Sequence, residues 1–121
     1  MNQIEKIRDE IKKYFDINQF IENSQEIFIS PNGNFRLETS NYHQAKNDVN
    51  WDVTKVEIFD NQSNEKLFEF FSNDGRFFHS WLQTNDIEYL ICAEDLFGGQ
   101  TVINLTNKQM SSYSLDEDGF I

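Results

Sequence analysis

The sequence predicts an α+β fold, in which an N-terminal amphipathic helix and a short second helix pack on an antiparallel β-meander of about seven or eight strands. The first residues repeat apolar side chains at helical spacing, whereas the chain from Glu26 onward consists of short β-rich runs separated by turn residues. Aromatic residues make up 15% of the chain and can supply the bulk of a core. We therefore expect one domain over residues 1–121. Its predicted parts are a helical segment at 1–24, an antiparallel sheet at 25–114, and 115–121 as an acidic tail or a last strand.

The helical pattern covers residues 3–15. The apolar face carries Ile4, Ile7, Ile11, Tyr14 and Phe15. The opposite face carries Glu5, Arg8, Asp9, Lys12 and Lys13. This arrangement is typical of a helix that packs on a sheet. Asp16 and Gln19 have the spacing of a capping box, which predicts the second short helix, ending near Asn23.

The rest of the chain reads as strands joined by tight turns. We place the strands near residues 26–29, 34–41, 51–60, 66–71, 76–82, 87–93, 100–105 and 108–113. The turn signals are Pro31-Asn32-Gly33, Asn73-Asp74-Gly75 and Gly98-Gly99, which supply residues that tolerate positive φ. The connections are too short for crossover helices, so the sheet must be antiparallel.

Two parts of the chain are similar at a spacing of about 42 residues. Ser30–Phe35 matches Ser72–Phe77, and Val56–Asn61 loosely matches Val102–Asn107. This pattern resembles the four-stranded blades of a β-propeller, and the resemblance covers about 85 residues. Two blades cannot close a propeller, so the resemblance implies two related meanders in one bent sheet or sandwich. Chance similarity between hairpin-rich sequences is the alternative.

Charge is the most unusual feature of the composition. The chain has 21 acidic residues against 10 Lys and Arg, a net charge of −11. Seven acids but only one base, Lys108, lie between Phe77 and Ile121. Such a surface repels nucleic acid and anionic membranes and favours a basic protein partner. Solubility alone is the alternative explanation.

The sequence also indicates a compartment. Cys92 is the only cysteine, so no internal disulfide can form and a reducing, cytoplasmic location is expected. No apolar segment follows Met1–Lys6 as in a signal peptide, and no apolar run approaches the ~20 residues of a membrane span. The frequent Asn, Lys, Ile and Phe suggest an AT-rich genome of bacterial or phage origin.

No catalytic residue, cofactor site or metal ligand is predicted. Cys92 lies in an apolar run before Glu94 and Asp95, which disfavour a reactive thiolate. His43 and His79 lack ligand spacing to another His or Cys.

The predicted partner-binding residues combine acids with an apolar pair. Between Ala93 and Gly99, two acids precede two large apolar residues, an arrangement suited to an interface anchor with a charged rim. The full predicted set is Glu94, Asp95, Leu96, Phe97, Asp86, Glu88, Asp116, Glu117 and Asp118. In the alternative reading, Leu96 and Phe97 fold back onto the core.

In size, acidity and lack of a catalytic motif, the chain resembles immunity proteins that block bacterial toxins, often nucleases, and phage inhibitors that imitate DNA. The resemblance implies a non-enzymatic inhibitor whose acidic face neutralises a basic partner. One alternative is a structural or adaptor module of a larger assembly, marked by an exposed sheet edge or an apolar patch. Another is a small-ligand-binding domain that uses His79, Trp81 and Glu94. The sequence leaves the oligomeric state open.

Overall fold

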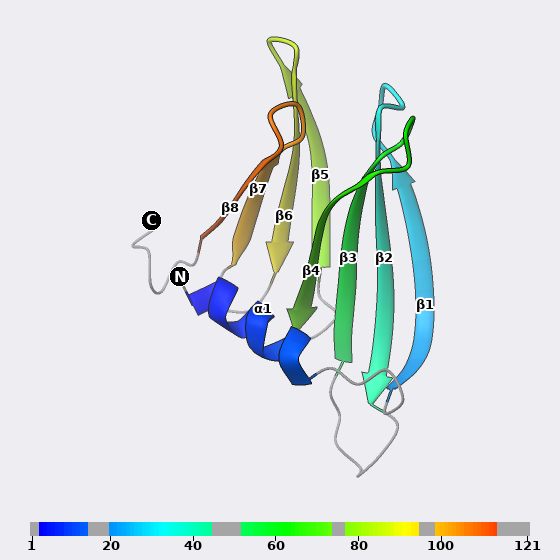
Figure 1. Cartoon of the computed structure of the whole chain (residues 1–121), viewed down its shortest axis with the longest axis vertical. Helices are drawn as coiled ribbons and strands as arrows, with labels where there is room; N and C mark the ends of the chain where they lie inside the picture. The colour runs from blue at the N-terminus through cyan, green and yellow to red at the C-terminus, as the bar shows by residue number, and fades with distance from the viewer. Residues whose placement is uncertain (1–2, 15–19, 45–51, 74–76, 95–98, 114–121) are drawn as a thin grey trace. The chain divides into compact units, whose positions relative to one another are not determined.

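The computed structural model is mostly β (Figure 1). It describes residues 3–14, 20–44, 52–73, 77–94 and 99–113. Within these residues, a single helix, α1 (Gln3–Tyr14), precedes eight strands. These are β1 (Phe20–Ile29), β2 (Phe35–Gln44), β3 (Asp52–Asp60), β4 (Lys66–Asn73), β5 (Phe77–Thr84), β6 (Ile87–Glu94), β7 (Gln100–Asn104) and β8 (Gln109–Tyr113).

The strands form two antiparallel four-stranded sheets. Sheet A has the order β1-β2-β3-β4 and sheet B the order β5-β6-β7-β8, so each sheet is a meander in chain order. Contacts within the chain divide it into two compact units. Arg8–Gly75 contains sheet A, and Met1–Ile7 with Arg76–Ile121 contains sheet B. The single domain over 1–121 stays a prediction.

The predicted α+β class is wrong. One helix of 12 residues accompanies eight strands, and the strands belong to two sheets instead of one meander of seven or eight. The antiparallel arrangement itself is confirmed. Hairpin signals fix which neighbouring strands pair, but the chain must also leave one sheet and begin another. β4 ends sheet A at Asn73 and β5 begins sheet B at Phe77, and the sequence between them shows only another turn signal.

The prediction of a second short helix is also wrong. β1 begins at Phe20, inside the segment predicted to be helical, and pairs with the far end of β2 through Phe20 and Gln44. The capping-box residues Asp16 and Gln19 lie outside the described residues. A cap contributes only about 1 kcal/mol, whereas strand pairing satisfies a backbone group at nearly every residue. The longer ladder therefore overrides the local helix signal, with a register shift between Glu22 and Ser24.

Sheet A buries one face more deeply than the other. On β3, Val56 and Ile58 are completely buried, whereas Glu57 between them and Phe59 after them are half-buried. Leu37 lies opposite Ile58 on β2 and is also completely buried. Two polar side chains on this face are satisfied across strands, since Thr54 donates to Asn41 at 2.6 Å and Asn41 donates to Ser24 at 2.8 Å. The buried hydroxyl of Ser72, opposite Thr54 on β4, has no hydrogen-bond partner among the described residues.

The turn at Pro31-Asn32-Gly33 joins β1 to β2, as predicted. Gly33 has φ of 81°, a conformation that non-glycine residues rarely adopt. The Ser30 hydroxyl accepts a hydrogen bond from the Phe35 amide at 2.9 Å and closes the turn.

Sheet B has its own buried face. Leu90, Cys92 and Ile103 are completely buried, so Cys92 is an interior residue of this sheet. Thr101 and Ser112 share a buried hydroxyl–hydroxyl hydrogen bond of 2.9 Å between β7 and β8.

The first pair of similar segments does not occupy equivalent places. Ser30–Phe35 forms the turn between β1 and β2, whereas Ser72–Phe77 runs from β4 into β5. Val56–Asn61 and Val102–Asn107 are equivalent in position, because each runs from the third strand of its sheet into the turn before the fourth. The resemblance to propeller blades stays a prediction.

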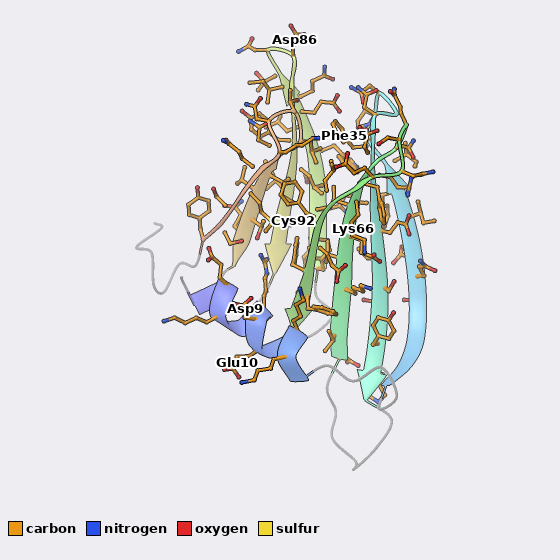
Figure 2. All side chains as sticks on the ribbon, viewed as in Figure 1. Asp9, Glu10, Phe35, Lys66, Asp86 and Cys92 are labelled. Carbon is orange, nitrogen blue, oxygen red and sulfur yellow. The ribbon has the colours of Figure 1, made fainter. Side chains whose placement is uncertain are left out.

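In α1, Arg8 departs from its predicted place on the solvent face. Arg8 is only 7% exposed, and its guanidinium carbon lies 4.0 Å from the centre of the Phe70 ring on β4. A guanidinium stacks well on an aromatic face, so this cation can be covered where a lysine could not. Asp9 and Glu10 are exposed on the helix, as Figure 2 shows.

Candidate protein-binding surfaces

Six of the nine predicted binding residues lie outside the described residues, namely Asp95, Leu96, Phe97, Asp116, Glu117 and Asp118. Glu94 is the last residue of β6, where its backbone pairs with Phe77 of β5. The loop in which acids accompany an apolar pair therefore stays a prediction.

Asp86 and Glu88 lie at one end of sheet B. Asp86 is exposed in the turn between β5 and β6, as Figure 2 shows, and both Asn85 and Asp86 have positive φ, 50° and 66°. Glu88 follows on β6, where its amide donates to the Thr106 hydroxyl at 2.9 Å and its carbonyl accepts from the Leu105 amide at 2.8 Å. These two bonds join the β5–β6 and β7–β8 hairpins, which fixes the hairpin that carries Asp86.

Charged side chains on the half-buried face of sheet A are paired with one another. Arg36 on β2 donates from Nε to Glu38 at 2.6 Å and from Nη1 to Asn61 and Asn64 at 3.0 Å each. Its guanidinium also lies 4.4 Å from the centre of the Phe59 ring. Because the Arg36 and Glu38 side chains are only 16% and 17% exposed, the acid is neutralised within the sheet.

A second pairing involves Lys66 on β4. Its ammonium lies 2.7 Å from a Glu57 oxygen and 2.8 Å from a Glu69 oxygen. The hydrogen bonds to Glu57 and Glu69 hold the pKa of Lys66 above its usual range, and the bond from Lys66 lowers the pKa of Glu69. Lys55, 3.9 Å from Glu57, adds a second cation. The acids on this part of sheet A already have cationic neighbours.

The histidines make ordinary contacts. Nδ1 of His43 lies 2.7 Å from Asp52 in a pair that is largely open to solvent, where ion pairs contribute little. The His79 and Trp81 rings on β5 meet edge to face, with centres 5.9 Å apart and planes at 78°. Catalysis would require a reacting group and a substrate pocket beside such a residue.

The described residues lack two kinds of feature. No group of three or more His, Cys, Asp or Glu side chains is placed to hold a metal ion. No described helix is long and apolar enough to cross a membrane.

Sheet B has one face on which none of the described residues is charged. We call it the charge-free face. The strand register places together Phe78, Ser80, Leu82, Thr84, Ile87, Tyr89, Ile91, Ala93, Gln100, Val102, Asn104, Gln109, Ser111 and Tyr113. Charged residues make up 26% of the chain, so a whole sheet face without one is unusual.

This face is open to solvent. Phe78 is 62% exposed and Leu82 49% exposed, whereas Tyr89, Ile91 and Val102 in the central strands are half-buried. Phe and Tyr are the residue types that interfaces favour, and contiguous exposed apolar surface marks interaction sites. Contact with solvent alone does not favour large apolar side chains at these positions.

Sequence reasoning missed this surface, although a signal was present. The segment from Phe77 to Asn85 contains no Asp, Glu, Lys or Arg, and neither does Gly98 to Asn107. The predicted partner contacts were acids and their neighbours, whereas the strand register brings together the segments that lack acids.

No protein-family model, curated protein or solved structure matches this chain. The resemblance to immunity proteins stays a prediction.

Proposed function

We propose that this chain is a non-enzymatic, cytoplasmic protein-binding inhibitor that neutralises a basic partner such as a toxin or nuclease. The uneven distribution of charge supports the proposal. In sheet A, Arg36 neutralises Glu38, and Lys66 bridges Glu57 and Glu69. From Phe77 onward, the sequence contains seven acidic residues and a single basic one.

Asp86 is the described acid that best fits this role. It is exposed at a hairpin tip, and hydrogen bonds of Glu88 tie that hairpin to the neighbouring one. A carboxylate fixed in this way attracts a basic surface at long range and speeds encounter without a large change in shape.

The experiment begins with capture of partners from lysate of the native host at about 50 mM and about 300 mM salt. A basic protein held at low salt and lost at high salt is the expected result. Its association rate is then compared for the wild type, Asp86→Asn and Glu26→Gln. Asp86→Asn removes one charge and keeps a residue type that tolerates positive φ. Glu26→Gln is the matched control, since Glu26 is exposed on sheet A.

We expect Asp86→Asn to slow association about twofold to fivefold and to flatten its salt dependence, with no change for Glu26→Gln. Equal rates for all three proteins would exclude Asp86 from the contact. Failure to capture any basic protein at low salt would contradict the proposed function.

A structural or adaptor module is the second candidate, and the charge-free face favours it. Exposed apolar side chains such as Phe78 and Leu82 are what that alternative requires. Binding to such a module would be indifferent to salt or strengthened by it, because apolar contact supplies the attraction.

A further inference from the structure

We propose that the charge-free face of sheet B binds the same face of a second copy of this chain, so that the protein forms a symmetric dimer. This inference is independent of the proposed inhibitor function. It rests on the strand register, on the exposed apolar residues and on the net charge.

The net charge of the chain favours a second copy as the partner that covers the charge-free face. Two copies carry −11 each and repel one another over most surfaces. Contact through the charge-free face places no described like charges against one another. A basic partner would gain most by meeting acids, and this face offers none among its described residues.

The composition of the face agrees with this occupant. Homodimer interfaces are more apolar than transient ones and are enriched in aromatic residues. Phe78 and Leu82 lie side by side with Ala93 and Tyr89 in the register, and Ile91 lies beside Val102 in the centre. A two-fold axis through the face would bring each residue against a surface of the same kind, as symmetric association requires.

Shape is also suitable. Two sheets pack face to face about 10 Å apart when their strands cross at about 30°, and two copies of one sheet share the same twist. Small polar side chains, at Ser80, Thr84 and Ser111, separate the larger ones and leave depressions for them.

The area of the face limits the size of the interface. Strands of eight, eight, five and five residues span about 19 Å across and about 17 to 26 Å along, or roughly 400 Å² in plan per copy. Two copies bury roughly 800 Å² in plan, and side-chain relief raises this towards the lower end of specific interfaces, near about 1,200 Å². We therefore expect a reversible dimer with a micromolar Kd.

The first measurement is the mass of the full chain by sedimentation from about 1 µM to about 500 µM. The mass should rise from 14.4 kDa towards twice that value. The dimer should strengthen a few-fold between about 20 mM and about 300 mM salt, because salt screens the repulsion between copies. Binding of a basic partner has the opposite salt dependence, so the two proposals fail separately.

Leu82→Lys locates the surface, with Ile27→Lys as its control. Leu82 is 49% exposed in sheet B and Ile27 is 58% exposed in sheet A, and both substitutions reduce the net charge to about −10. Leu82→Lys should weaken the dimer about tenfold or more, because each interface would bury two new charges. Ile27→Lys should leave it unchanged or slightly stronger. Circular dichroism and the melting temperature check that both variants fold.

Three results would overturn the inference. These are a monomer at every concentration and salt, equal dissociation by Leu82→Lys and Ile27→Lys, or open-ended growth beyond a dimer. A monomer that still captures a basic protein would leave the proposed function standing without this dimer. A dimer that captures no basic protein would support this inference and contradict the proposed function.

Discussion

Arg36 should be one of the larger single contributors to the stability of sheet A. Arg36→Met keeps an apolar stem against Phe59 but removes the bond to Glu38 and the two bonds to Asn61 and Asn64. The charge-assisted bond contributes about 1.5 kcal/mol, and the two amide bonds and the cation–π contact together about 1 kcal/mol more. We expect the free energy of unfolding to fall by about 2 to 3 kcal/mol.

Urea unfolding of the full chain, followed by circular dichroism, measures this loss. Arg36→Lys keeps the charge but not the forked geometry, so it should lose about 1 kcal/mol. Combining Arg36→Met with Glu38→Gln should recover about 1 kcal/mol, since the acid is no longer left half-buried and unpaired. Lys55→Met is the control, because its ammonium lies 3.9 Å from Glu57 and contributes little. A loss below about 0.5 kcal/mol for Arg36→Met, or one no larger than the control's, would refute the pairing argument.

Three further predictions concern single residues. The pKa of Glu69 is lowered by the hydrogen bond from Lys66, so its contribution is fully present above the ordinary carboxyl pKa of 4.5 and is lost as the pH falls through the lowered pKa. Glu69→Gln should therefore destabilise the chain near about pH 7, and its difference from the wild type in urea titrations should shrink as the pH falls through the lowered pKa of Glu69. Asn85 has φ of 50°, so Asn85→Ala should cost about 1 kcal/mol and Asn85→Gly only a few tenths, measured by the same titrations. Cys92 is completely buried, so a thiol reagent should modify it in urea and only slowly in the native protein, and fast native labelling would contradict that burial.

Local pattern was sufficient for most strands. The predicted strand near 51–60 is β3 at Asp52–Asp60, and the one near 87–93 is β6 at Ile87–Glu94. Strands separated by tight turns have little choice of partner, so hairpin signals are reliable over short distances. The same locality explains the errors, because neither the length of the β1–β2 ladder nor the break between the sheets is encoded in any single turn.

The candidate site was harder to predict than the strands. Composition drew attention to acids, and the predicted set mixed Asp86 and Glu88 with a loop that lies outside the described residues. The charge-free face depends on which alternate residues of four strands share one side. That is settled by register, and a shift of one residue would move Phe78 and Leu82 to the other face.

The two sheets deal with their solvent-facing surfaces in different ways. Sheet A places Arg36, Glu38, Glu57 and Lys66 on its half-buried face, where opposed charges satisfy one another and discourage association with other chains. A single lysine at position 82 would give sheet B similar protection, yet none of the described residues on its charge-free face is charged. An exposed apolar sheet face is an aggregation risk unless something covers it. On a chain with a charge of −11, a second copy of the same neutral face covers it without bringing the acidic surfaces together.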